Sequence, residues 1–354
     1  MRKPIISRRD LFAGTSALAA GAAFSTYVRG AAPPPTATTP TLIAAAKKEG
    51  KVVWYTSVDT KLAQQIGKLF ESKYGVPCAV ERTGAERLLQ RIGQEYSANV
   101  HAVDVVNSSD ASHLVIWKNK GWLEAYVPED VAKYYPAEHK DADGMYASFR
   151  IFLCVIAYNT NLVKKEEAPK SFKDLLDPKW KGKIVKSHPG YSGATMTATF
   201  ETARDIGWGY FEALAKQNIM QVQSATDPPK KLALGERAIQ ADGVEYLIFS
   251  EKESGQPVEP VYATEGTPLI VGPNGMFKAA PHPNAARLFQ NYCFTPECQQ
   301  LCINIGGLRS AHPQAKEKPG RTPLSRIKLM KDDPVGVLKS AEEIKAHYVK
   351  LFHV

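Results

Sequence analysis

The sequence has no uninterrupted apolar run long enough to cross a bilayer, so an integral membrane protein is not expected. It has no GxGxxG after an expected strand and no GxSxG, HExxH or CxxC motif. The usual sequence signs of nucleotide-dependent enzymes, serine hydrolases, zinc proteases and thiol oxidoreductases are therefore missing. There is also no dense stripe of Lys and Arg interleaved with aromatic residues, and we expect no nucleic-acid partner.

The composition that remains is that of a soluble globular protein. Hydrophobic residues make up 44% and charged residues 23% of 354 residues, a length that suits two lobes of ordinary domain size. The formal net charge is +9. The first 32 residues carry five basic side chains and one acidic side chain, so the rest of the chain has a net charge of about +5. This mildly basic balance suits an anionic ligand.

The N-terminus has the three-part layout of a cleaved export signal. Arg8 and Arg9 precede a short, weakly apolar stretch at 13–24, and small residues follow at 30–32. The adjacent arginines favour a twin-arginine signal over residues 1–32, with an ordinary secretory signal as the alternative. No cysteine near residue 32 offers a site for a lipid anchor, so we expect a soluble periplasmic protein. The Pro- and Thr-rich residues 33–41 are expected to be a linker.

The five cysteines leave disulfide pairing open. An odd count leaves at least one unpaired thiol if disulfides form. Two of them share a helix face at i, i+4 spacing, but no histidine pair or CxxC accompanies them, so small buried residues are favoured over metal ligands. The cysteines are Cys78, Cys154, Cys293, Cys298 and Cys302.

Strands and helices alternate along the chain, which predicts an α/β fold with a mostly parallel sheet. A helix at 42–49 should end at Gly50. Strands are expected at 52–55, 76–81, 104–106, 151–158 and within 261–276, and helices follow the first three of them.

Three polar loops follow the first three expected strands, at 56–59, 82–84 and 107–110. In an open parallel sheet, ligands bind beyond the carboxyl ends of the strands, and helix N-termini attract anions. Ser, Thr and Asp are also the ordinary N-caps of helices, so any single loop is explained by capping alone. Three such loops at one sheet edge, with Arg82 among them, favour a ligand site.

A fourth loop, at 187–194, combines small residues with His188 and Tyr191. Its Ser192-Gly193-Ala194 segment would let a ligand approach the backbone closely. A lone His or Tyr in a loop is usually structural, so the small residues carry this expectation.

The segment from Asp174 to Ile184, with Ser192-Gly193-Ala194 and Gly306-Gly307-Leu308-Arg309, resembles the type 2 periplasmic, or extracellular, solute-binding proteins of ABC transporters. The ferric-iron-binding branch is the most similar, and the resemblance covers roughly residues 50–312. It implies two α/β lobes, joined by two hinge strands, that close over a ligand in the cleft between them.

The resemblance also implies a domain organisation. Lobe 1 would comprise 42–153 plus 263–312, lobe 2 would comprise 154–262, and a helical tail would follow at 313–354. The hinges would fall near 150–158 and 259–264. Such a protein is no enzyme and needs no cofactor; it works as a monomer that delivers its solute to a membrane permease driven by an ATPase.

Iron binders of this family use a His in the first loop, a Glu after the third strand and two adjacent tyrosines. This sequence has Asp59 and Ser109 at or near the first two places and Glu245-Tyr246 at the third. Ser192-Gly193-Ala194 matches the loop that holds an anion beside the metal. The resemblance therefore favours a small organic anion, carboxylate- or phosphate-bearing, over a metal, with any polar or cationic end of the solute facing Glu245. The expected ligand-binding residues are Thr56, Ser57, Arg82, Thr83, Gly84, Ser108, Ser109, Asp110, Arg150, Tyr191, Ser192, Gly193, Ala194, Glu245 and Tyr246.

Three alternatives stay open from the sequence. A ferric-iron-binding protein would use Asp59, Tyr191, Glu245 and Tyr246, since a ferric ion prefers anionic oxygen ligands. A periplasmic enzyme exported by the twin-arginine route would turn over a substrate. A receptor could instead pass its solute to a signalling sensor.

Overall fold

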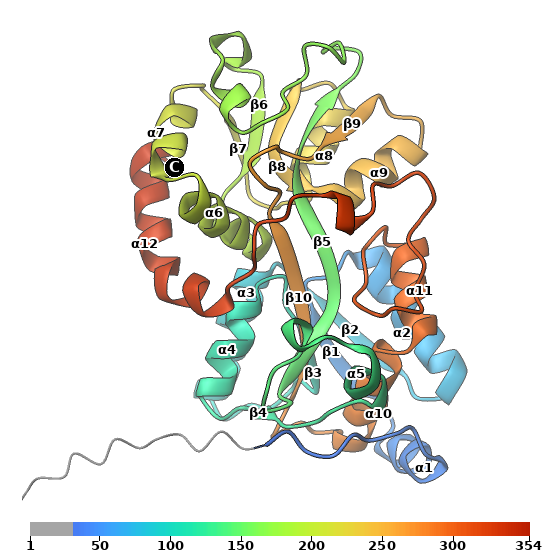
Figure 1. Ribbon diagram of the computed structural model, residues 1–354. Coiled ribbons are helices and arrows are strands. Elements are labelled where there is room, and N and C mark those ends of the chain that lie inside the picture. Colours follow the sequence, from blue (N-terminus) through green and yellow to red (C-terminus); the bar gives the residue numbers. More distant parts are fainter. Residues whose placement is uncertain (1–30) are drawn as a thin grey trace, which may run out of the picture. The chain divides into compact units, whose positions relative to one another are not determined.

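The structure is a computed structural model that describes residues 31–354 of the chain. Its strands form one mixed sheet (Figure 1). The predicted signal at 1–32 lies almost wholly outside the described residues. The strand order is β2-β1-β3-β10-β5-β8-β6-β7, with β4 beside β10 and β9 beside β5. The strands are β1 (Val52–Thr56), β2 (Cys78–Arg82), β3 (Val105–Asn107), β4 (Leu123–Glu124), β5 (Tyr146–Asn159), β6 (Ile184–Ser187), β7 (Met220–Val222), β8 (Ile239–Val244), β9 (Val258–Val261) and β10 (Leu269–Phe277).

The predicted α/β class is confirmed, but the sheet is mixed rather than mostly parallel. β1 pairs in parallel with β2 and β3, and β6 pairs in parallel with β7 and β8. The long strands β5 and β10 run antiparallel to each other and to the groups on either side of them. Because these strands carry the chain back and forth between the two halves of the sheet, they cannot follow the direction of both groups.

The helices lie between and beside these strands, and α1 to α4 lie where the sequence predicted helices. They are α1 (Pro40–Glu49), α2 (Thr60–Tyr74), α3 (Ala85–Ser97), α4 (Ala111–Asn119), α5 (Glu129–Tyr134), α6 (Gly193–Asp205), α7 (Trp208–Ala215), α8 (Asp227–Ala233), α9 (Glu245–Glu253), α10 (Pro283–Cys293), α11 (Pro296–Asn304) and α12 (Pro334–Phe352). α1 ends at Gly50 and α2 at Gly75, both in the left-handed conformation that glycine adopts without strain. None of the helices among these residues is long and apolar enough to span a bilayer.

Two large apolar clusters pack against the sheet, and the first extends from β1 and β10 to Ala194, Val244 and Tyr246 of the other half. One surrounds Trp54 and Phe289 beneath β1 and β10, and another surrounds Trp180 and Phe211 beside β6 and β8. We keep the names lobe 1 (42–153 plus 263–312) and lobe 2 (154–262) for these halves. The first hinge segment proposed from the sequence, 150–158, lies within β5. The second proposed segment, 259–264, lies before β10, which is the long strand that pairs with β5.

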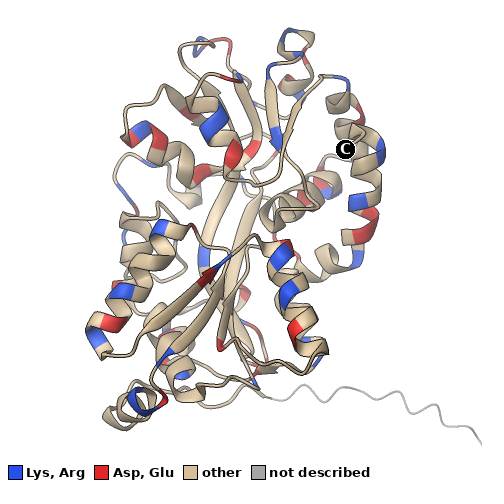
Figure 2. Cartoon of the chain, turned by 180° about the vertical axis from the view of Figure 1, so that it is seen from behind, with Lys and Arg blue, Asp and Glu red and all other residues tan. Residues whose placement is uncertain are grey.

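The C-terminal segment proposed as a helical tail is helical only in part. Residues 313–333 contain a single turn of 3-10 helix, Leu324–Arg326, and the long helix α12 follows. All five cysteines are free thiols, and Cys298 and Cys302 are buried in α11. Lys and Arg are interspersed with Asp and Glu over the helices (Figure 2).

Candidate functional site

A cavity lies where the carboxyl ends of β1, β2 and β3 face the N-terminus of α6. Parallel strands end at a common edge, so the three polar loops are neighbours in space although they are far apart in sequence. The predicted residues that line the cavity are Ser57, Arg82, Gly84, Ser109, Arg150, Tyr191, Ser192, Gly193, Ala194 and Tyr246.

Arg150, on β5, is the most unusual side chain of the lining. It is 2% exposed, and no carboxylate of residues 31–354 forms an ion pair with it. One Nη donates to Ser57 Oγ at 2.8 Å, the guanidinium lies 5.3 Å from the ring centre of Phe152, and Nε has no partner. Burial lowers the pKa of Arg150 to about 10. A buried cation with unused donors, facing a cavity, is suited to an anion.

Gly272 provides the space for this arginine. It is the register partner of Arg150 on β10. A Cβ at Gly272 would lie 2.7 Å from Arg150 Nε and 3.1 Å from the carbonyl oxygen of Ser108. A larger residue would therefore displace the guanidinium.

The charge of the lining is wholly positive. Arg82 and Arg87 join Arg150 around the cavity, and no Asp or Glu is among the lining residues. Arg82 Nε donates to the carbonyl oxygen of Val58 at 3.3 Å, which holds its side chain near the site. Both Arg82 and Arg87 are exposed, so their charges act through solvent more than that of Arg150 does.

The N-terminus of α6 forms the opposite wall. Ser192 caps the helix, its Oγ accepting from the backbone N–H of Thr195 at 3.3 Å. Gly193 lies against the other side of the cavity: a Cβ there would be 2.7 Å from Asp110 Cβ and 2.9 Å from Ala85 Cβ. The free N–H groups of this helix end add partial positive charge to the site.

Two tyrosines supply aromatic surface. Tyr246 is buried, packs edge-to-face on Phe152 with ring centres 5.6 Å apart, and has its pKa raised to about 12 by burial. Tyr191 is half exposed and its ring lies 5.1 Å from that of His188. Tyr246 therefore carries a neutral phenol at neutral pH.

Other predicted residues support the loops instead of lining the cavity. Thr56 Oγ1 accepts from the N–H of Val58 at 3.1 Å, and Asp59 caps α2 through the N–H of Lys61 at 3.0 Å. The lining likewise omits Thr83, Ser108 and Asp110.

Glu245 is placed differently from the expectation that it faces the solute. It is fully buried, and its carboxylate accepts from Arg309 Nη2 at 2.7 Å, Arg321 Nη2 at 3.1 Å and Tyr262 Oη at 2.6 Å. These three partners already satisfy both oxygens, so Glu245 is held in an internal ion-pair network and does not line the cavity. Of the four residues considered for iron, only Tyr191 and Tyr246 line it.

Sequence reasoning missed part of the lining. The missed residues are Ala85, Arg87, Phe152, Gln223, Ser224, Ala225, Thr226 and Val244. The polar loop at 223–226 follows β7 and precedes α8, so the rule that identified the other loops would have found it. Phe152 and Val244 lie within buried strands and carry no such signal.

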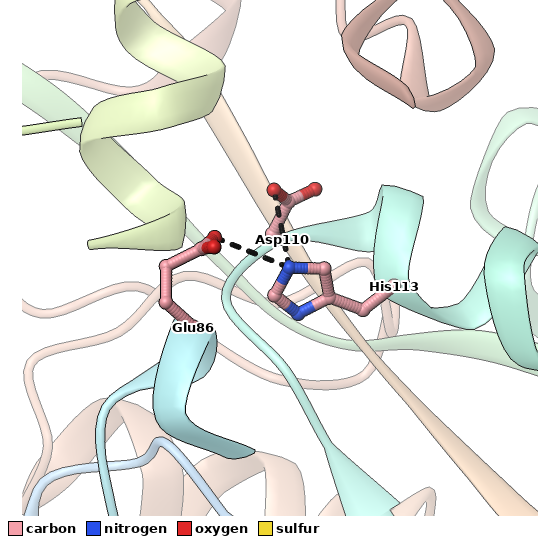
Figure 3. A group of neighbouring side chains, drawn as sticks. All are labelled: Glu86, Asp110 and His113. Atoms are coloured by element: carbon pink, nitrogen blue, oxygen red, sulfur yellow. Dashed lines mark ion pairs between the residues drawn. The ribbon is translucent and has the colours of Figure 1, made fainter. Parts of the chain in front are cut away.

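One group of potential metal ligands occurs among residues 31–354: Glu86, Asp110 and His113 (Figure 3). His113 Nε2 lies 3.3 Å from Glu86 Oε1 and 3.6 Å from Asp110 Oδ2, and Lys345 Nζ lies 3.4 Å from Glu86 Oε2. Burial favours neutral imidazole, but Asp110 and Glu86 outweigh it and raise the pKa of His113. With two basic groups beside two carboxylates, the cluster balances its charge without a metal.

Comparison with known proteins identifies the class. Residues 102–327 match the bacterial extracellular solute-binding protein family. The chain therefore belongs to this family and is a solute-binding protein, not an enzyme. The predicted resemblance to type 2 periplasmic binding proteins of the ferric-binding branch is confirmed.

Individual relatives agree with this assignment. An uncharacterized protein of Haemophilus influenzae is 28% identical over 310 residues, covering 81% of this chain and 86% of the relative. The periplasmic binding protein AfuA from Actinobacillus pleuropneumoniae, solved with exogenous fructose-6-phosphate bound, is 26% identical with a TM-score of 0.78 over 86% of this chain and 99% of its own. Iron-bound HitA from Pseudomonas aeruginosa is 20% identical with a TM-score of 0.75 over 85% and 99%.

Proposed function

We propose that this protein is the periplasmic receptor of an ABC importer and that it captures a small organic anion, with a phosphate monoester favoured over a carboxylate. The observation that carries the proposal is Arg150, a buried guanidinium that lines the cavity, has no carboxylate partner in residues 31–354 and has an Nε without a hydrogen-bond partner. A dianionic phosphate would neutralise it and accept bidentate hydrogen bonds.

The remaining lining suits such a solute. Arg82 and Arg87 would attract a dianion, and the N–H groups at Gly193 and Ala194 would bind its oxygens. Tyr246 and Phe152 would pack against the carbon part of the solute. AfuA, solved with a sugar phosphate bound, supports this ligand class for a related fold.

The iron alternative is less well supported. A bare ferric ion needs anionic oxygen ligands, whereas the cavity is lined by three arginines, no carboxylate and two tyrosines. Asp59 and Glu245, the two carboxylates considered for iron, are engaged elsewhere.

For the cellular setting, we propose that residues 1–32 are a twin-arginine signal that is removed on export. The mature protein would then work in the periplasm as a monomer, because one solute held between two lobes needs no second copy. It would deliver the solute to a permease and ATPase pair.

The proposal is tested by native mass spectrometry of the mature protein, purified without stripping, beside its denatured mass. An organic adduct of phosphate-monoester mass supports the proposal, and an iron adduct contradicts it. Calorimetry on stripped protein then compares fructose 6-phosphate with fructose and with ferric citrate. Binding of the phosphate ester but not of fructose is expected, and equal binding of both sugars would remove the role of the arginines.

A further inference from the structure

Helix α12 packs against helices from both halves of the molecule (Figure 1). It packs against α4 of lobe 1 and against α6 and α7 of lobe 2. Lys345 and Tyr348 are three residues apart, so they share one face of the helix. The two side chains reach opposite lobes.

The contact with lobe 1 is an ion pair inside a buried cluster. Lys345 Nζ lies 3.4 Å from Glu86 Oε2, in the first turn of α3. Glu86 in turn faces His113, whose Nδ1 is 2.9 Å from Ser108 Oγ. The Glu86 side chain is nearly inaccessible to solvent, so this carboxylate depends on Lys345 and His113 for its charge balance.

The contact with lobe 2 is aromatic and hydrogen-bonded. Tyr348 is fully buried, and its Oη donates to Gln221 Oε1 at 3.0 Å. Its ring lies 4.9 Å from that of His188 and 5.2 Å from Lys186 Nζ. One turn earlier on the same helix, Ile344 packs in an apolar cluster with Met196 of α6.

Both contacts adjoin the cavity. Ala85, which lines it, immediately precedes Glu86, and His188 packs against the lining residue Tyr191. Between them, Gly193 of lobe 2 approaches Asp110 and Ala85 of lobe 1 too closely to allow a Cβ. The lobes therefore meet along this seam, and α12 lies across it.

We propose that α12 is an interlobe clasp that opposes cleft opening and so slows solute release. The inference rests on the proposed two-lobed cleft. For the lobes to part along this seam, either Lys345 must leave Glu86 or Tyr348 must leave lobe 2. Loss of the lysine contact leaves a buried carboxylate with one partner fewer, so the closed state is favoured while the clasp holds.

The test uses Lys345→Met in the mature full-length protein, with Lys339→Met as the matched control. Lys339 is exposed on the same helix and has no ion pair within residues 31–354, so both variants lose one positive charge from α12. Small-angle X-ray scattering of the ligand-free protein reports opening without any ligand. Stopped-flow dissociation of fructose 6-phosphate reports release.

Lys345→Met is expected to increase the radius of gyration of the ligand-free protein and to speed dissociation about threefold to tenfold. Lys339→Met should leave both within experimental error of wild type. A Glu86→Gln variant completes a double-mutant cycle, in which the two changes together should have little more effect than either alone. Unchanged scattering for Lys345→Met, or additive effects in the cycle, would overturn the clasp.

The scattering arm also separates this inference from the proposed function. If fructose 6-phosphate does not bind wild-type protein but Lys345→Met still opens the ligand-free form, the clasp stands and the solute assignment fails. If the sugar phosphate binds and Lys345→Met behaves like Lys339→Met in both assays, the solute assignment stands and the clasp fails.

Discussion

Replacing Arg150 with methionine should weaken ligand binding and at the same time stabilise the empty protein. Burial lowers the pKa of Arg150 from 12.5 to about 10. Each pKa unit equals about 1.36 kcal/mol, so keeping this charge inside the protein opposes folding by about 3 kcal/mol. The folded pKa lies below the unfolded value, so this cost is fully present at neutral pH and is relieved only as the pH rises through about 10.

Methionine keeps much of the side-chain volume and removes the charge. It also loses the hydrogen bond to Ser57 and the contact with Phe152, each a modest favourable contribution. We therefore expect the free energy of unfolding of ligand-free Arg150→Met to rise by about 1–2 kcal/mol. Loss of a buried, charge-assisted contact to the solute should weaken its binding at least about 30-fold.

The assay is urea unfolding of protein that has first been stripped of ligand by denaturation and refolding, with calorimetry on the same samples. Arg82→Met is the matched control, since Arg82 lines the same cavity but is exposed. It should weaken binding about tenfold and change stability by less than about 0.5 kcal/mol. The reasoning would be refuted by an Arg150→Met protein that is less stable than wild type without ligand, because the charge would then be compensated within the fold.

Three further results are expected. Gly193→Ala should weaken solute binding at least about tenfold and lower the free energy of unfolding by about 1–3 kcal/mol, because its Cβ would collide with Asp110 and Ala85. Calorimetry and urea unfolding check this, and unchanged affinity and stability would contradict the close approach. Glu245→Gln should lower the free energy of unfolding by about 3 kcal/mol, because it leaves two buried arginines without their carboxylate. The affinity for the solute, measured at urea concentrations below the unfolding transition, should stay within about threefold of wild type. A large loss of affinity without destabilisation would instead make Glu245 a ligand of the solute. The free energy of unfolding of wild type should exceed that of His113→Gln most below pH 6.5, and this difference should fall as the pH rises through the raised pKa of His113. Urea unfolding at a series of pH values measures the difference. A difference that grows with pH would contradict the ion pairs of His113 with Glu86 and Asp110.

Glu245 illustrates where reasoning from a family motif stops. At the sequence level it occupies the place of a metal-ligating tyrosine beside Tyr246, which suggested a role in the site. Its actual partners, Arg309 and Arg321, come from the C-terminal part of the chain. No local pattern could show that two distant arginines occupy this carboxylate.

The sequence by itself determined the local elements and the polar edge of the sheet at which the cavity lies. Periodicity and capping placed β1 to β3 and the helices after them, because these depend on neighbouring residues such as Gly50, Gly75 and Asp110. The rule that ligands lie beyond parallel strand ends then brought Ser57, Arg82 and Ser109 to one cavity. Tertiary structure alone decided which polar groups remain free, because that depends on contacts between distant segments. Within residues 31–354 it left Arg150 without a carboxylate, satisfied Glu245, and packed α12 against α4, α6 and α7.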